Sequence, residues 1–429
     1  MPAAAYAASS TPVNLSKNSG LSQEPVVNSV GSNVYVAWED NTSSGRNTIY
    51  FVNSHDGGSI WNPIQQLSGK GGAESVQMAA TGNYVFLVWK QNGQTAFAAS
   101  KNSGDSFGPV ITFSFANGKT SEPSIATNGT AVYIGWQWDS TINSSRFGLM
   151  AQSYDDGATF TSVHQFASIS VVELQVAASG DYVYAVWDSI YASASADGGR
   201  TFSAPQKLSD PNCSSLTHCV SREPMVAVSG SYVYVTWPSD PNGVYQGNIR
   251  ASSDHGQTWA PTVTFAAPQG VQKVRELQVA TCSSSNQQVP CGPTSNVYVT
   301  FRAQSVNGGT VDQWIAVSHN YGASFTLTQF TQKKGQLGFG GIAVDGTNVY
   351  VFWGHQGKGG IGQMFMQAST DGGNTWGSVI QQVSDSATGT IGMYDSNQYH
   401  DQGPIVSASD GMAFMVWQDM NGDVYFSSA

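Results

Sequence analysis

Short alternating apolar runs that end in an aromatic residue recur along the whole chain. In each run, β-branched or aromatic residues occupy every second position, which is the period of a β-strand. The eight runs are VYVAW (34–38), VFLVW (85–89), VYIGW (132–136), VYAVW (183–187), VYVTW (233–237), VYVTF (297–301), VYVFW (349–353) and AFMVW (413–417). No segment shows an apolar period of 3.6 residues, so the pattern predicts an all-β protein of eight repeated units.

Three further short runs accompany each alternating run, so each unit has four strands. In the first unit, one run precedes the alternating run from Glu24, another follows it (IYFVNS, 49–54), and a fourth comes later (PIQQLS, 63–68). Radial repetition of four-stranded antiparallel sheets is typical of a β-propeller. The eighth unit ends at VYFSSA (424–429) without a fourth strand, whereas TPVNLS (11–16) is a strand without a unit. We therefore expect an eight-bladed propeller whose N-terminal strand completes the last blade.

The chain is expected to be one domain. Residues 11–429 form the propeller, and residues 1–10 look like a leader or linker remnant because PAAAYAA is similar to the end of a small-residue cleavage site. The expected blades are 22–68, 74–115, 122–167, 172–209, 222–266, 275–330, 338–383, and 402–429 with 11–16.

A second motif, Ser-x-Asp-x-Gly-x-Thr-Trp or a close copy, lies between the third and fourth strands of seven units. Its copies begin at Ser54, Ser100, Ser153, Ser195, Ser252, Ser318 and Ser369. An Asp side chain can accept backbone N–H groups in such a turn, and glycine supplies the positive φ. The third positions are Asp56, Asn102, Asp155, Asp197, Asp254, Asn320 and Asp371. Because asparagine replaces aspartate twice, we expect these residues to be structural.

This motif resembles the Asp box (the bacterial neuraminidase repeat) of sialidase-like β-propellers. The resemblance covers nearly the whole chain and implies that the motif turns lie on one face of the ring and ligands bind on the other. Sialidases have six blades, whereas eight are expected here. The family also uses three arginines, a Tyr–Glu nucleophile pair and an Asp acid/base. Arg222, Arg275 and Arg302 fall on neighbouring blades, so the match to a sialidase site is poor.

Composition and charge limit the partners. Charged residues are 10% of the chain and the net charge is −11, which argues against nucleic acid or an anionic membrane. No apolar run approaches the ~20 residues of a membrane span. Cys213 and Cys219 lie close together, as do Cys282 and Cys291, so we expect two local disulfides, with reduced thiols as the alternative. These features predict an extracellular or cell-surface protein that binds a glycan or another extracellular protein.

Glutamates recur at a fixed distance from the strand aromatic. Glu24, Glu122, Glu173 and Glu223 stand fourteen residues before it, Glu74 stands one further, and Glu276 precedes an insertion. Their repetition favours a structural role, in which each carboxylate accepts hydrogen bonds from the next blade. A calcium site is the second interpretation, and catalysis is the third. No cofactor is required by the sequence.

Residues that break the repeat are the other candidates. The longest insertion, from about 384 to 402, contains Tyr394, Asp395, Tyr399, His400 and Asp401. Aromatic residues beside carboxylates are suited to gripping sugars, although an ordinary polar loop surface is the alternative. The candidate ligand-binding residues are Trp138, Glu39, Asp40, Glu122, Glu173, Glu223, Glu276, Arg222, Arg275, Arg302, His355, Tyr394 and His400, and the candidate catalytic residues are Glu24, Asp401 and Tyr399.

We therefore expect a glycan- or protein-binding surface or scaffold module that acts through this acidic face, where we expect the chain's scarce charge to be concentrated. The alternatives are a glycoside hydrolase with paired carboxylates, acting on neutral glycans sooner than on sialic acid, and a structural subunit of a cell-surface assembly.

Overall fold

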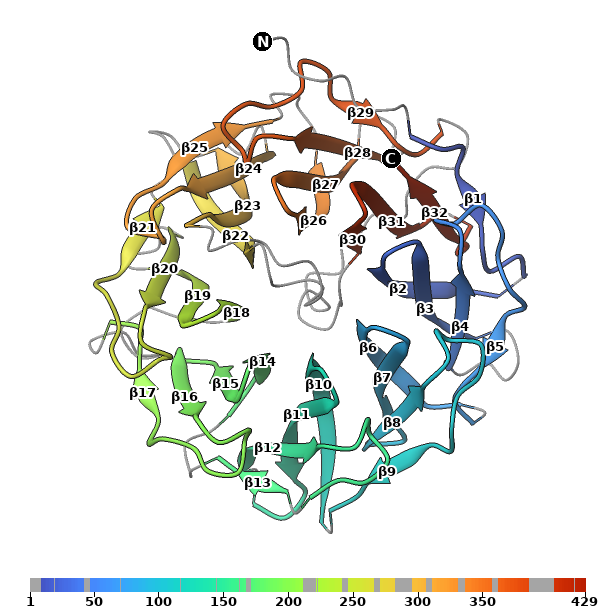
Figure 1. The fold of residues 1–429 in the computed structure, drawn as a ribbon, viewed down its shortest axis with the longest axis vertical. Coiled ribbons are helices and arrows are strands. Elements are labelled where there is room, and N and C mark those ends of the chain that lie inside the picture. Colours follow the sequence, from blue (N-terminus) through green and yellow to red (C-terminus); the bar gives the residue numbers. More distant parts are fainter. Residues whose placement is uncertain are drawn as a thin grey trace.

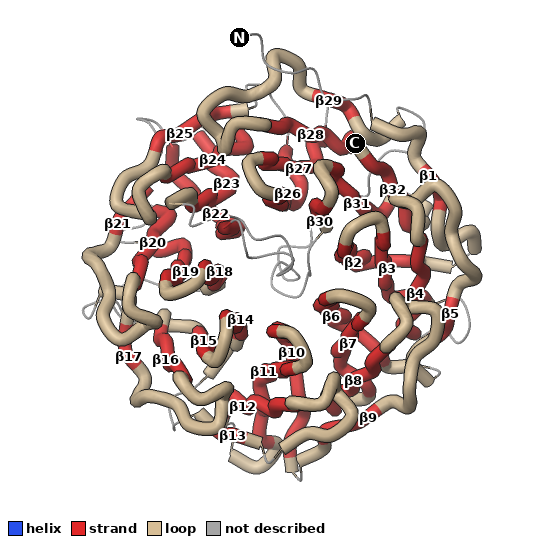
Figure 2. The backbone as a smooth tube through the Cα atoms, in the orientation of Figure 1, coloured by secondary structure: helices blue, strands red, loops and turns tan. Residues whose placement is uncertain are grey.

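Eight four-stranded antiparallel sheets surround a central axis in the computed structural model (Figure 1). It describes residues 9–18, 20–41, 47–69, 71–115, 117–143, 145–161, 163–166, 171–210, 221, 223–240, 246–265, 271–281, 295–305, 311–330, 336–356, 362–385, 405–419 and 421–429. Strands joined by turns make up all of this described part, and no helix occurs in it (Figure 2). The prediction of an all-β, eight-bladed propeller is confirmed.

The strands follow one another from the axis outward within each blade. Their bounds, blade by blade, are β2 (Ser22–Val30), β3 (Asn33–Asp40), β4 (Thr48–Ser54), β5 (Gln65–Gln66); β6 (Ala73–Thr81), β7 (Tyr84–Gln91), β8 (Gln94–Ser100), β9 (Ile111–Phe113); β10 (Gly118–Asn128), β11 (Ala131–Ser140), β12 (Arg146–Ser153), β13 (His164–Gln165); β14 (Gln175–Ser179), β15 (Tyr182–Trp187), β16 (Tyr191–Ser195), β17 (Gln206–Lys207); β18 (Met225–Ser229), β19 (Tyr232–Ser239), β20 (Gln246–Ser252), β21 (Val263–Phe265); β22 (Val271–Thr281), β23 (Val297–Ser305), β24 (Val311–Ser318), β25 (Thr326–Gln329); β26 (Gln336–Asp345), β27 (Asn348–Gln356), β28 (Gly362–Ser369), β29 (Gln381–Gln382); and β30 (Val406–Ser409), β31 (Met412–Gln418), β32 (Val424–Ser428) with β1 (Val13–Asn14).

The last blade is completed by the N-terminal strand, as expected. Val13 pairs with Phe426 and Asn14 with Tyr425 in an antiparallel ladder. The Leu15 N–H donates to the Val424 carbonyl at 2.8 Å, and the Leu15 side chain is buried in the adjoining core. The chain ends thus hold the ring closed.

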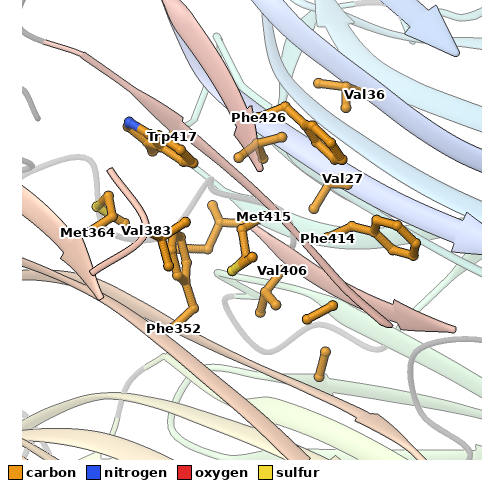
Figure 3. Close-up of a cluster of buried hydrophobic side chains, with 14 of the residues drawn as sticks. Val27, Val36, Phe352, Met364, Val383, Val406, Phe414, Met415, Trp417 and Phe426 are labelled. Atoms are coloured by element: carbon orange, nitrogen blue, oxygen red, sulfur yellow. The ribbon is translucent and has the colours of Figure 1, made fainter. Parts of the chain in front are cut away.

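The core lies between neighbouring blades. The aromatic residues that end the alternating runs, such as Trp38 and Trp417, are almost completely buried. Figure 3 shows one cluster, in which Phe352 and Met364 of the seventh blade and Met415 of the eighth meet, with Val27 of the first close by. Burial of these large side chains against the next sheet is the main stabilising contribution of each blade.

Seven turns between the third and fourth strands share one hydrogen-bond pattern. In the first, Ser54 Oγ donates to Asp56 Oδ1 at 2.8 Å and accepts from Gly58 N at 3.0 Å, and Asp56 Oδ1 also accepts from Ile60 N. Gly57 N donates to the carbonyl of Ser32, which lies in the turn between β2 and β3. Both kinds of turn therefore lie on one side of the ring, here called the motif face. The side where the innermost strands begin is called the glutamate face.

Within the described residues, no helix is long and apolar enough to cross a membrane. All four cysteines lie outside the described residues, so the two disulfides stay predictions.

Candidate functional site

The recurring glutamates occupy a left-handed backbone position where the innermost strand begins. Their φ angles are +49° for Glu24, +50° for Glu122, +55° for Glu173, +54° for Glu223 and +55° for Glu276. In the first, third and sixth blades this position lies within an irregularity in strand register, such as that between Gln23 and Val26. Non-glycine residues rarely adopt this conformation, so its repetition shows that the bulge is a built feature of the repeat.

Two of these carboxylates, Glu122 and Glu173, accept a backbone hydrogen bond from the next blade. Glu122 Oε2 accepts from Glu173 N at 3.2 Å, and Glu173 Oε2 accepts from Glu223 N at 2.8 Å. Asp188 Oδ1 also accepts from Glu223 N, at 3.2 Å. Between the first two blades Glu39 takes this role, with Oε1 2.5 Å from Ser75 N. These contacts are the inter-blade hydrogen bonds that the structural interpretation expected.

Glu24 and Glu39 form a pair of carboxyl groups. Glu39 is 1% exposed, and its Oε2 accepts from Asn47 Nδ2 at 2.6 Å. Burial, followed by the charge of Glu24 and the hydrogen bond with it, raises the pKa of Glu39 well above its ordinary value. The neighbouring Asp40 is also completely buried and accepts from Ser22 Oγ at 2.6 Å. Glu39 and Asp40, which the sequence suggested as ligand-binding residues, are therefore buried acceptors of hydrogen bonds within the protein.

Two further glutamate candidates, Glu276 and Glu74, are found in ion pairs. Glu276 is nearly buried beside Arg302 and bonded to it, while Arg275 lies opposite Arg302 across the β22–β23 ladder. Glu74 is exposed and pairs with Lys90 at 2.7 Å, because Ser75 occupies the left-handed position in that blade. Glu74 stands one residue further from the strand aromatic than the glutamates that stand fourteen residues before it, and the left-handed conformation of Ser75 accounts for this offset.

No three His, Cys, Asp or Glu side chains of the described residues form a group that could hold a metal ion. The glutamates named as metal candidates, Glu24, Glu74, Glu122, Glu173, Glu223 and Glu276, accordingly do not form such a group with one another.

Trp138 stands where most other blades have a polar residue. Two residues after the strand aromatic, the first blade has Asp40 and the second has Gln91. Gln91 Oε1 accepts from the buried indole of Trp89 at 3.1 Å, and its Nε2 donates to the Gly71 carbonyl at 2.8 Å. Trp138 has no acceptor to offer, and the buried Nε1 of Trp136 beside it has no hydrogen-bond partner among the described residues. The equivalent indoles of Trp38, Trp187, Trp353 and Trp417 likewise have no partner among the described residues, so the Gln91–Trp89 bond is a feature of the second blade.

The surroundings of Trp138 combine aromatic and charged groups at the end of the β11–β12 hairpin. Its ring covers Gly118, where an added Cβ would overlap the indole, and lies 5.5 Å from the Phe147 ring. Next to it, Arg146 Nε lies 3.3 Å from Asp139 Oδ1, and both side chains are more than a third exposed. A partly exposed indole beside an exposed ion pair is the kind of surface that can stack and hydrogen-bond a sugar.

The other candidates are more dispersed. His355, on β27, packs edge-on to Phe365 with ring centroids 6.3 Å apart. Arg222, Tyr394, Asp395, Tyr399, His400 and Asp401 lie outside the described residues. Asp188, Lys90 and Gln137, which directly follow the strand aromatic, were not predicted from the sequence. A comparison of that position among the blades would have found them, because it is charged or polar in six of them (Glu39, Lys90, Gln137, Asp188, Arg302 and Gln418).

Acidic residues lie on both faces of the ring, and their expected concentration on the glutamate face stays a prediction. The turns of the motif face carry Asp56, Asp105, Asp155, Asp156, Asp181, Asp197, Asp254, Asp345, Asp371 and Asp410. Hydrogen bonds from the turn, first of all those from the following threonine, lower the pKa of Asp155, Asp197 and Asp254 to about 2. The motif face therefore keeps its negative charge in mild acid.

No protein-family description and no curated protein matches the chain. Among solved structures, it is similar to an ulvan lyase of a new polysaccharide lyase family bound to -[GlcA(1-4)Rha3S]-, with 10% identity and a TM-score of 0.51 over 81% of this chain and 90% of that one. A Trypanosoma rangeli sialidase in complex with the inhibitor DANA has 12% identity and a TM-score of 0.42 over 84% of this chain and 57% of that one. The similarity to the ulvan lyase structure concerns the propeller fold alone.

Proposed function

We propose that this propeller is a glycan-binding module, exported to the cell surface or beyond, and that it binds neutral sugars on the glutamate face around Trp138. The observation that carries the proposal is Trp138 itself, a partly exposed indole beside an exposed ion pair, at a position where most other blades have a polar residue. An aromatic ring next to hydrogen-bonding groups is suited to stacking on a sugar.

Glycan binding explains the arrangement of the carboxyl groups on the glutamate face better than glycoside hydrolysis does. A glycosidase needs two carboxyl groups on opposite sides of the scissile bond, separated by roughly 5–9 Å. Glu24 instead shares a hydrogen bond with Glu39, while Glu122 and Glu173 accept backbone N–H groups of the next blade. These carboxylates stiffen the rim of the ring, and a rigid rim reduces the entropy cost of binding.

Trp138→Gln tests the proposal because it copies the residue of the second blade. The introduced glutamine can accept from Trp136 Nε1, so the melting temperature should stay the same or rise, corresponding to about 1 kcal/mol for one recovered hydrogen bond. Binding to neutral oligosaccharides on a glycan array should become more than about tenfold weaker, because the aromatic anchor is lost.

The matched control is Tyr321→Gly on the motif face, which should leave glycan binding unchanged. Wild-type protein that binds no glycan would contradict the proposed function, and so would a Trp138→Gln variant that binds as tightly as the wild type.

A further inference from the structure

Three successive seams between blades carry stacked planar groups on the motif face. The guanidinium of Arg200 lies over the Tyr154 ring, 4.5 Å from its centroid. At the next seam, His255 stacks on Tyr182 with centroids 3.5 Å apart and an interplanar angle of 8°. At the third, Tyr321 stacks on Tyr232 at 4.4 Å and 16°. These residues lie in or next to β12, β15, β16, β19, β20 and β24, on neighbouring blades (Figure 1).

The rings are not required by the turns that carry them. His255 and Tyr321 occupy the fourth motif position with φ of +58° and +60°. Three other copies have glycine there, Gly57, Gly198 and Gly372, which adopts this conformation at no steric cost. Tyr321 is also 37% exposed, unusual for so large a ring. Two copies therefore hold an aromatic side chain where the turn prefers glycine.

The charge around these rings is negative and fixed. Asp155, Asp197 and Asp254 belong to the turns that carry Tyr154, Arg200 and His255, and their lowered pKa values keep them ionised, whereas the turn of Tyr321 has the neutral Asn320. The only lysine or arginine residues in the described turns of this face are Lys101 and Arg200. Burial lowers the pKa of His255, so its ring is neutral near pH 7 and does not repel a cation.

We propose that the stacked pairs Tyr182–His255 and Tyr232–Tyr321 form a docking surface for a basic polypeptide segment, whose arginine side chains stack on these partly buried rings and on the exposed Tyr321. The charge of the face matches such a partner. Arg200 on Tyr154 shows the same contact made within the chain one seam away, where its Nη1 also donates to the Asp197 carbonyl at 2.6 Å. A planar guanidinium stacks on an aromatic ring better than an ammonium does.

The test uses His255→Gly combined with Tyr321→Gly in the full chain, because glycine is the native residue of three other motif copies. The probes are octa-arginine and octa-lysine peptides, measured by titration calorimetry. Wild-type protein should bind octa-arginine more tightly than octa-lysine. The double variant should bind octa-arginine about tenfold more weakly, while losing little affinity for octa-lysine.

Ser103→Gly is the matched control, because Ser103 occupies the same left-handed position without a ring (φ +56°). It should bind both peptides as the wild type does. Equal affinity of the wild type for the two peptides, or an unchanged affinity in the double variant, would overturn the proposal. The proposed glycan site lies on the opposite face. The outcome of the peptide titrations therefore does not depend on whether the protein binds glycans.

Discussion

At the scale of single residues, the Glu24–Glu39 pair makes the stability of the ring depend on pH. The folded state holds the Glu39 proton more tightly than the unfolded chain does, because burial and Glu24 raise the pKa of Glu39. The resulting stabilisation is fully present below the ordinary value of 4.5 and is lost as the pH rises through the folded value. Since Glu39 binds Ser75 N, the effect falls on the seam between the first two blades.

Glu24→Gln should remove this dependence. The amide can donate a hydrogen bond to the ionised Glu39 without adding a charge, so we expect the melting temperature at pH 8 to rise by about 1–4 °C. The wild type should lose stability between pH 5 and pH 8, and the variant should lose less. Glu74→Gln is the control, because Glu74 pairs with Lys90 instead of a carboxyl group. A variant with the wild-type pH profile would disprove the coupling.

The glutamates could be found in the sequence by counting from the strand aromatic, but their roles could not. Whether a carboxylate meets a backbone N–H, an arginine or another carboxyl depends on the neighbouring strand and blade. Glu39, predicted as a ligand residue, is buried for this reason. Trp138 was identifiable because it breaks a repeat, and its contacts with Gly118 and Phe147 became visible only in the packed hairpin.

At the scale of the element, the motif turn is held by hydrogen bonds and does not need a charge. Asp254 accepts from Ser252 Oγ at 2.7 Å, from Thr258 N at 2.8 Å and from Thr258 Oγ1 at 2.5 Å. Asn102 reproduces this arrangement in the second blade, with Oδ1 3.1 Å from Ser106 N and Nδ2 donating to Ser106 Oγ at 3.0 Å. Asparagine is therefore a structural equivalent in this turn.

Asp254→Asn should melt within about 1 °C of the wild type at pH 7, whereas Asp254→Ala should melt about 2–4 °C lower because backbone and hydroxyl donors lose their acceptor. The aspartate's contribution is present above its ordinary pKa of 3.8 and is lost as the pH falls through about 2. Over this acidic range the asparagine variant should therefore lose less stability than the wild type. Equal destabilisation by both substitutions at pH 7 would show that the turn needs the charge.

Strand number and order followed from alternation alone, but bulges did not. A bulge adds one residue to a strand without changing which residue types it contains, so a period of two cannot reveal it. In the sequence, the bulge of the innermost strand was indicated by the one-residue offset of Glu74. It is explained by Ser75 at the left-handed position (φ +58°).

At the scale of the whole molecule, ring closure was predictable because one end lacked a strand and the other had a strand to spare. The partners of the acidic residues on each face were not, because they depend on which turns and strands the ring brings together. The resulting molecule has two chemically different faces. One has carboxylates engaged with neighbouring blades, and the other has ionised aspartates beside stacked rings.

Deleting residues 1–16 should lower the melting temperature markedly, since it leaves β32 as an unpaired edge and removes Leu15 from the core. Leu15→Ala alone should cost about 2–4 kcal/mol in a denaturant titration. Neither effect would be seen if the ring were closed by other contacts.

A circular permutant separates the pairing of β1 from its place at the start of the chain. The register of Val13 with Phe426 and Asn14 with Tyr425, continued outward, sets Ser10 opposite Ala429, and Ser10 N already donates to the Ser428 carbonyl at 2.7 Å. A two-residue Asn-Gly turn between Ala429 and Ser10 would therefore convert β32 and β1 into a hairpin. The new ends would lie between Gly20 and the exposed Leu21. The permutant keeps every strand pair and makes the closing contact local, so it should melt at or above the wild-type temperature. If the melting temperature of the permutant is instead as low as that of the deletion variant, the N-terminal strand stabilises the ring through its position in the chain and not through its pairing with β32.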